Sequence, residues 1–183
     1  MDDTGIIDLY WTRDERAVEE TQRKYGSYFR TVSWNILKNS EDVEECLNDT
    51  YVRVWNAIPP QRPMSLRAFG ATIVRNLSLT RWRAGQSLRR GGGQPEAALH
   101  ELADCVADGP EQWLQAAELS RSLDKFLRQL PEKDRCVFLR RYWFFEPMED
   151  IARRYKLPLG SVKSGLHRTR KKLKEYLEKE ELL

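Results

Sequence analysis

The residue types that most often perform catalysis or bind metals are scarce in this chain of 183 residues. It contains two histidines and three cysteines, and the cysteines are far apart, without the C-x-x-C spacing of zinc sites. Glu45 and Asp49 would share a helix face at i and i+4, and with Glu44 they offer the carboxylates of a metal-dependent nuclease. No histidine or other general base lies near them, so we expect no catalytic residue, no metal and no cofactor.

The basic residues predict contact with an anionic partner. The net charge is only +3, but no Asp or Glu occurs between Ala57 and Pro95. Every charge in that stretch is basic: Arg62, Arg67, Arg75, Arg81, Arg83, Arg89 and Arg90. A second basic segment runs from Glu146 to Leu183, with ten Lys or Arg against seven acids. A single run of this kind is as often a solvated helix face, but two runs with interleaved Trp and Leu favour a nucleic-acid partner.

Helices must position these charges, because apolar residues recur at helical spacing in five or six segments and strand signals are weak. We therefore predict an all-α protein. Between Glu41 and Trp55 one face of the expected helix is apolar and the other polar, and Asn39 or Ser40 can cap it. Three prolines end this helix, and Ser65 can cap the next one, whose other face is basic.

The break between these helices and the rest of the chain predicts two domains. The sequence from Gly91 to Pro95 is GGGQP, and the stretch that follows has little periodicity. We expect two unlike helical domains, residues 1–90 and 112–183, joined by a flexible linker at 91–111. No apolar run is long enough for a membrane span and the N-terminus is not a secretory signal, so we expect a cytoplasmic protein without membrane insertion.

Near the C-terminus, the spacing predicts a helix-turn-helix. Ile151 and Ala152 on a first helix, Leu157 at the turn and Val162 on a second helix supply its apolar contacts. We expect the chain to turn at Gly160 and Ser161 to cap the second helix. The residues expected to face outward, toward the major groove of DNA, are Lys163, His167, Arg170, Lys171 and Lys174. The alternative is an ordinary helical hairpin with a basic surface.

Three segments resemble the sigma-70 family of bacterial RNA polymerase sigma factors, specifically its extracytoplasmic-function (ECF) group, which keeps regions two and four. EDVEECLNDTYVRVW, from Glu41 to Trp55, resembles the core-polymerase-binding helix of region two. SLRAFGATIVRNLSLTRWR, from Ser65 to Arg83, resembles the helix that melts and reads the minus-ten element. Leu130-Pro131-Glu132 with the helix-turn-helix resembles region four, which reads the minus-35 element.

The resemblance implies partners and site residues. The partners would be core RNA polymerase, through its beta-prime clamp and beta flap, and promoter DNA, both double-stranded and as the melted non-template strand. The polymerase contacts would be Glu45, Asn48, Asp49 and Arg53. The region-two DNA contacts would be Arg75, Asn76, Arg81 and Arg83, beside a base-capturing loop at Ala57–Met64; Trp82 would be either a stacking platform or core. The region-four DNA contacts would be Ser161, Lys163, Ser164, His167, Arg168, Arg170, Lys171 and Lys174.

Some points stay open at the level of sequence. The family usually has Gln where Asn48 stands, Gly where Lys156 stands, and a larger residue where Gly165 stands. If the backbone is left-handed at Lys156, the side chain costs on the order of 1 kcal/mol. The resemblance does not decide whether an anti-sigma factor binds. A helix-turn-helix regulator that does not bind polymerase would explain the C-terminus but not the helix from Glu41 to Trp55.

Overall fold

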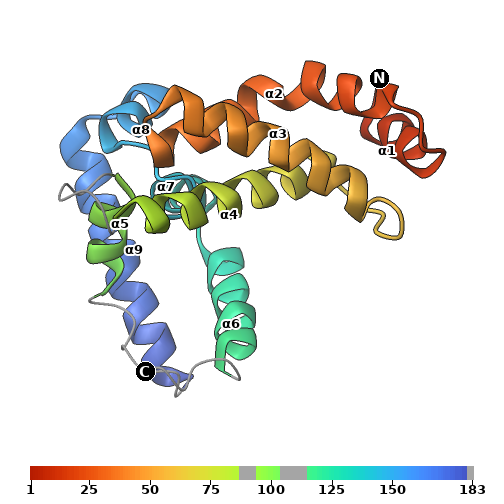
Figure 1. Cartoon of the computed structure of the whole chain (residues 1–183). Helices are drawn as coiled ribbons and strands as arrows, with labels where there is room; N and C mark the ends of the chain where they lie inside the picture. Colours follow the sequence, from red (N-terminus) through yellow and green to blue (C-terminus); the bar gives the residue numbers. More distant parts are fainter. Residues whose placement is uncertain (87–93, 104–114, 181–183) are drawn as a thin grey trace. The chain divides into compact units, whose positions relative to one another are not determined.

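The computed structural model describes residues 1–86, 94–103 and 115–180, and within these ranges the chain is helical, with no strand (Figure 1). This confirms the predicted all-α class. None of the described helices is long and apolar enough to cross a membrane. The helices are α1 (Asp3–Trp11), α2 (Arg16–Leu37), α3 (Ser40–Ala57), α4 (Leu66–Gln86), α5 (Gln94–Ala103), α6 (Gln115–Gln129), α7 (Glu132–Tyr142), α8 (Met148–Tyr155) and α9 (Leu159–Lys179).

The chain divides into two compact units, an N-terminal unit at Met1–Gly91 and a C-terminal unit at Gly92–Leu183. The structure differs from the sequence analysis inside the range expected as a linker, because α5 is a helix that packs on α7. Its Ala98 is fully buried. Residues 91–93 and 104–111 of the expected linker, and also Arg89 and Arg90, lie outside the described residues.

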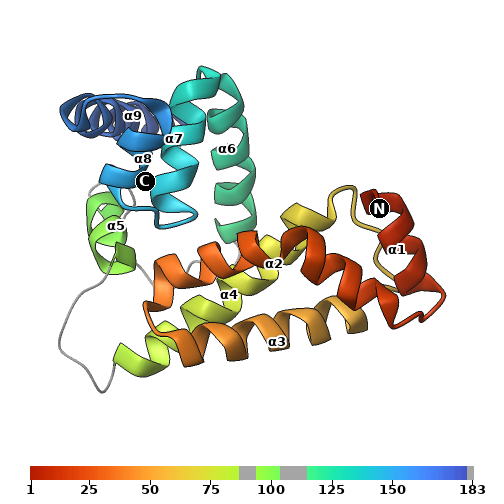
Figure 2. The same cartoon turned by 90° about the horizontal axis from the view of Figure 1, so that it is seen from above.

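The N-terminal unit is built on α2, α3 and α4, which run side by side (Figure 2). Their inward faces supply the expected apolar stripes, including Phe29, Val32, Val43 and Val54, all nearly or fully buried. Gly70 allows α4 to approach α2 closely, since a Cβ atom there would lie 2.3 Å from the Phe29 ring. The predicted caps are present: Asn39 accepts a hydrogen bond from the Asp42 amide, and Ser65 accepts one from the Ala68 amide.

A helix that the periodicity did not reveal, α1, completes this core. Ile6, Ile7 and Tyr10 pack with residues that end α3 and begin α4, namely Val54, Ile58 and Leu66. Tyr10 is fully buried, and its hydroxyl forms a hydrogen bond of 2.8 Å with Thr21. The Asp2 side chain caps α1 by accepting from the Gly5 amide at 2.9 Å. The N-terminal residues are therefore part of the folded unit and not a tail.

The C-terminal unit has its core along one face of α9. Val162, Leu166, Leu173 and Leu177 are almost completely buried, as predicted, and residues of α7 and α8 pack on the same side. Three prolines are the N-cap residues of helices here: Pro131 before α7, Pro147 before α8 and Pro158 before α9. The buried face of α9 leaves its opposite face to solvent.

Candidate nucleic-acid and protein interfaces

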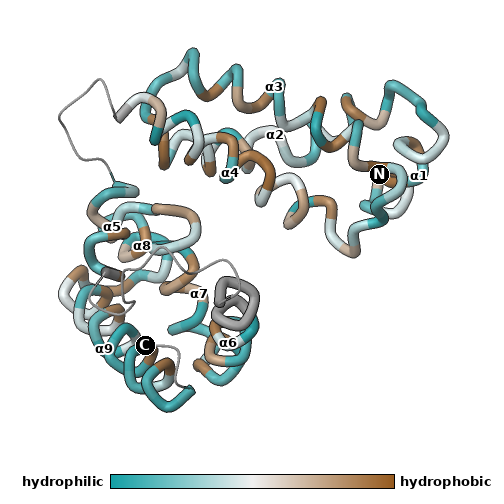
Figure 3. Tube along the Cα trace, turned by 60° about the horizontal axis from the view of Figure 1, so that its bottom comes forward, coloured by the Kyte–Doolittle hydropathy of each residue, from teal (hydrophilic) through white to brown (hydrophobic). Residues whose placement is uncertain are grey.

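The solvent side of α3 carries the residues predicted to bind a protein partner. Glu45, Asn48, Asp49 and Arg53 are all exposed, and the opposite side of the helix is buried. Figure 3 shows hydrophobic and hydrophilic residues alternating along α3. The exposed side therefore forms a polar and mainly acidic surface, which suits a basic protein partner and a reversible contact.

Val52 lies within this surface, and sequence reasoning missed it. Its side chain is 58 % exposed although it is apolar. It lies seven residues after Glu45 and four after Asn48, so it shares their face of α3. The sequence could have indicated it, because Val52 is an apolar residue outside the apolar stripe of this helix. A partner that covers Glu45 and Asn48 would also bury Val52.

The basic residues of α4 differ in how accessible they are. Asn76 and Arg83 are exposed, whereas Arg75 is only partly exposed. Burial, with a contribution from the nearby charge of Arg83, lowers the pKa of Arg75 to about 10. Trp82 is half-buried. Arg75 is therefore held partly inside the unit, and Arg83 and Asn76 offer the accessible donors for a nucleic-acid strand.

Arg81 is occupied by two acids of α3. Its Nε donates to Asp42 Oδ1 at 2.6 Å, and its Nη1 lies 2.6 Å from Glu45 Oε1. These hydrogen bonds raise the pKa of Arg81 and lower the pKa of Glu45. One predicted DNA contact and one predicted polymerase contact therefore bind each other. The separation of 39 residues between Arg81 and Asp42 explains why no local sequence pattern indicated this.

The loop between α3 and α4 begins where the proline-rich stretch ends α3. Met64 is fully exposed, whereas Arg62 forms an ion pair with Asp8 of α1 and lies over the Trp11 ring. A second arginine of the acid-free stretch thus has an acidic partner from elsewhere in the unit. The loop presents Met64 and Gln61 to solvent and is held to α1 on its other side.

The helix-turn-helix consists of α8 and α9, and its turn differs from the expected one. Lys156 is left-handed, with φ 53° and ψ 46°, and the Leu157 amide donates to the Ala152 carbonyl at 2.9 Å. Gly160 and Ser161 already lie inside α9, whose N-cap is Pro158. The predictions that Gly160 makes the turn and that Ser161 caps the helix are therefore wrong. Lys156 makes the turn, with the strain anticipated for a non-glycine residue.

The solvent face of α9 carries most of the predicted DNA contacts. Exposed there are Ser161, Lys163, Ser164, His167, Arg168, Lys171 and Lys174. Arg170 differs, because its Nη1 donates to the Tyr142 hydroxyl at 2.5 Å and lies 3.3 Å from Glu101 Oε2. It lies two turns before buried Leu177 and so shares the inward face. The prediction that Arg170 faces outward is therefore wrong.

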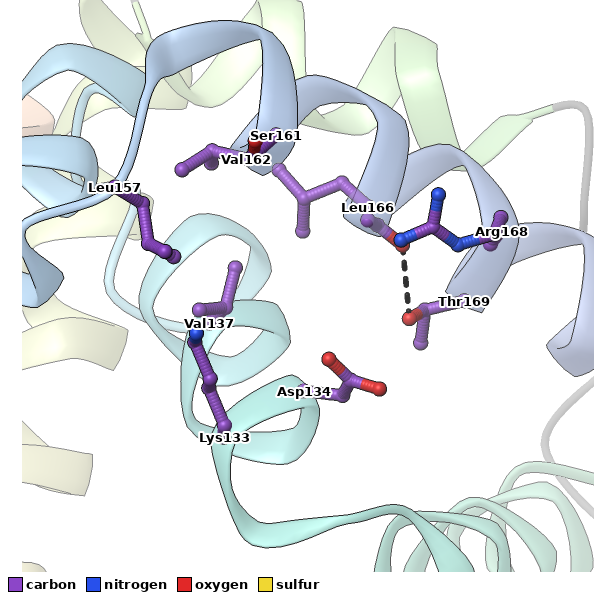
Figure 4. A pocket seen from close by; sticks show the side chains of 10 residues that line it. Lys133, Asp134, Val137, Leu157, Ser161, Val162, Leu166, Arg168 and Thr169 are labelled. Atoms are coloured by element: carbon purple, nitrogen blue, oxygen red, sulfur yellow. Dashed lines mark hydrogen bonds between the residues drawn. The ribbon is translucent and has the colours of Figure 1, made fainter.

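A cavity of about 160 Å³ lies between α7 and α9, beside this basic face (Figure 4). Its lining is mixed, with apolar side chains beside polar and charged groups of both helices. The lining includes Val137, Leu157, Val162, Leu166, Lys133, Asp134 and Arg168. Gly165 also lines it, and a Cβ atom at that position would meet no neighbour within 4 Å. Packing therefore does not require a glycine at position 165, and the absence of a side chain there leaves the cavity open.

Two of the three acids considered for a nuclease are engaged with arginines. Glu44 pairs with Arg30, and Glu45 pairs with Arg81. Over the ranges that the structure describes, no three His, Cys, Asp or Glu side chains lie close enough together to hold a metal ion. The geometry of these carboxylates thus fits surface ion pairing.

Comparisons with known proteins agree with this arrangement. Residues 21–88 match the family described as Sigma-70 region 2, and residues 120–173 match the family described as Sigma-70, region 4. Over 171 residues the chain is 34% identical to the ECF RNA polymerase sigma factor SigW of Bacillus subtilis, covering 90% of each chain. It is 26% identical over 181 residues to the ECF RNA polymerase sigma factor SigE of Mycolicibacterium smegmatis, covering 96% of this chain and 68% of the relative.

A third relative is the RNA polymerase sigma-E factor of Streptomyces avermitilis, 26% identical over 169 residues, which cover 87% of this chain and 88% of the relative. The match to region two, which contains α3 and α4, rules against a regulator that shares only the C-terminal helix-turn-helix. The chain therefore belongs to the sigma-70 family, within its extracytoplasmic-function group, as a DNA-binding sigma factor of transcription initiation.

Proposed function

We propose that residues 1–90 act as region two and residues 112–183 as region four in promoter recognition. In this proposal α3 binds the beta-prime clamp of core RNA polymerase. The accessible donors of α4 and the loop at Ala57–Met64 hold the melted non-template strand of the minus-ten element. The exposed face of α9 reads the minus-35 element in the major groove, and the C-terminal unit also contacts the beta flap.

The observation that carries the proposal is the division of α9 into two faces. Its apolar residues are buried against α7 and α8, while seven of the eight residues predicted to contact DNA are exposed. The first turns carry Lys163, Ser164 and His167, where recognition helices reach base edges. Lys171 and Lys174 follow further along, at a distance from the turn that suits contacts to phosphates.

Support for the polymerase contact comes from α3. Its exposed residues Asn48 and Asp49 make no contribution to the core, and Val52 adds an apolar surface between polar neighbours. Interfaces of this composition, with an apolar centre and a polar rim, are typical of partners that associate and separate. A sigma factor must release the polymerase after initiation, so such a contact fits its task.

Run-off transcription with core RNA polymerase tests the whole proposal, because a transcript requires both core binding and promoter melting. Core polymerase with this protein should give a defined transcript from its promoter, and core polymerase alone should give none. Promoter-containing genomic fragments can serve as templates. If the protein binds DNA but never supports initiation by core polymerase, the proposal is wrong.

The polymerase contact is tested by replacing Asn48 and Asp49 together with Ala. We expect weaker binding to core polymerase and almost unchanged helicity and melting temperature, since exposed substitutions usually change stability by less than about 0.5 kcal/mol. Glu44→Ala is the matched control, because Glu44 is an exposed acid of α3 that is not among the predicted contacts and pairs with Arg30. Equal core affinity for the double variant and the wild type would contradict the assignment of α3.

A further inference from the structure

The ion pairs of Arg81 connect the two surfaces of the N-terminal unit. Asp42 and Glu45 belong to α3, the helix assigned to polymerase, and Arg81 belongs to α4, the helix assigned to DNA. All three groups keep contact with solvent: the exposed side-chain fractions are 36% for Arg81, 35% for Asp42 and 58% for Glu45. A phosphate that approaches Arg81 must therefore compete with two carboxylates that already hold it.

We propose that Glu45 exchanges partners when the protein binds core polymerase. In the free protein Glu45 masks Arg81 from nucleic acid, and a basic group of the polymerase draws Glu45 away and frees Arg81 Nη1 for a phosphate. This inference rests on the proposed function, since it takes α3 as the polymerase surface and α4 as the DNA surface. Arg81 then contacts phosphate only when α3 is bound to the polymerase.

The two acids have different parts in this exchange. Glu45 is the more exposed of the two and lies on the same face of α3 as Asn48 and Val52, where a partner would reach it. Asp42 lies in the first turn of α3, where its backbone amide is held by the Asn39 cap. It binds Arg81 through Nε and leaves Nη1 to Glu45. When Glu45 leaves, Asp42 still orients the guanidinium.

Thermodynamic linkage makes the effect reciprocal: if core binding favours DNA binding at Arg81, DNA binding favours core binding by the same factor. The size of the coupling is bounded by the strength of an exposed ion pair, which corresponds to a factor of about two to five in an equilibrium constant. This coupling strengthens DNA binding modestly, beyond the other contacts of the promoter complex, and it acts only where core polymerase and DNA are both present.

The test measures binding of fluorescent single-stranded oligothymidine by the full-length protein, free and in the holoenzyme, using anisotropy. Oligothymidine is suitable because a contact between Arg81 and phosphate does not depend on sequence. Glu45→Gln removes the competing charge and keeps the side-chain shape. We expect this variant to bind the free oligonucleotide about two- to five-fold more tightly than the wild type. In the holoenzyme the gain should disappear.

Two controls separate the partner exchange from a general change in charge. Glu44→Gln removes the same charge from the neighbouring position, but Glu44 pairs with Arg30 and not with Arg81. In the Arg81→Gln background, Glu45→Gln should bring no gain, because the group that it masks is absent. Equal gains for Glu44→Gln and Glu45→Gln, a gain that persists with Arg81→Gln, or no measurable gain in the free protein would each overturn the inference. The proposed function fails on a different result, the core affinity of the Asn48 and Asp49 double variant.

Discussion

Replacing Glu101 by Gln tests whether α5 is a structural part of the C-terminal unit. The carboxylate of Glu101 accepts hydrogen bonds from three side chains of other helices. Oε1 accepts from Arg141 Nη2 at 2.6 Å, while Oε2 accepts from the Tyr142 hydroxyl at 2.8 Å and lies 3.3 Å from Arg170 Nη1. Burial raises the pKa of Tyr142, so this phenol stays a neutral donor. The variant removes the one negative charge among these contacts.

The expected cost follows from the burial of Arg141, whose side chain is only 3% exposed. Removing one partner of a buried ion pair costs about 3 to 5 kcal/mol, because the other charge stays buried. Here the loss is smaller, since the Gln side chain keeps an acceptor and Gln94 Oε1 still accepts from Arg141 at 2.6 Å. We therefore expect about 2 to 4 kcal/mol, or roughly a 30- to 900-fold change in the opening equilibrium of the unit.

Native-state hydrogen exchange of the full-length protein, resolved by peptide, measures this opening in each unit separately. Amides of α7 and α9 should exchange faster in the Glu101→Gln protein by that factor, while those of α2 and α3 keep their wild-type rates. Glu96→Gln removes an exposed acid from the same helix and should change little. If Glu101→Gln leaves α7 and α9 within two-fold of wild type, the carboxylate does not hold α5 to this unit and the reasoning is refuted.

Three further predictions concern the two interfaces and the core of the N-terminal unit. Lys163→Ala should cost roughly 1 to 3 kcal/mol of binding free energy on the preferred minus-35 duplex and much less on scrambled DNA. Lys171→Ala or Lys174→Ala should instead weaken binding to both duplexes and lower the salt slope of the affinity by about one unit. Equal losses for Lys163→Ala on both duplexes would contradict base reading. Val52→Ser should weaken core-polymerase binding several-fold without changing the melting temperature, as titration with labelled core would show. Burial raises the pKa of Tyr10 from 10.0 to about 12. The N-terminal unit should therefore lose roughly 2 to 3 kcal/mol of stability as the pH rises from about 10 to about 12. Urea titrations should show a smaller loss for Tyr10→Phe.

Local patterns predicted the features that depend on neighbours in sequence. The caps at Asn39 and Ser65 and the buried stripe of α9 follow from spacing within one or two turns, and the structure confirms them. The turn of the helix-turn-helix was misplaced by four residues, because Lys156 takes a conformation that favours glycine, and Gly160 does not. Residue type alone was the wrong guide to where the chain turns.

Long-range pairing explains what sequence reasoning missed in the candidate sites. Arg81 and Arg170 have ordinary basic sequence surroundings, yet their acidic partners lie 39 residues and 69 residues away. The helix α5 was missed because it buries few apolar residues and depends on Glu101 instead. The helix α1 was missed for a similar reason. Its apolar pattern is too short to predict a helix, and its apolar residues pack against Val54 and Leu66, which are distant in sequence.

The acid-free arginine stretch has a consequence for how this sigma factor responds to salt. Arg62 and Arg81 carry their own counterions in Asp8, Asp42 and Glu45. An arginine that moves from a carboxylate to a phosphate leaves behind an acid that must recruit a cation from solution, which cancels part of the ion release from DNA. DNA binding by this protein should therefore weaken less with rising ionic strength than its arginine content suggests.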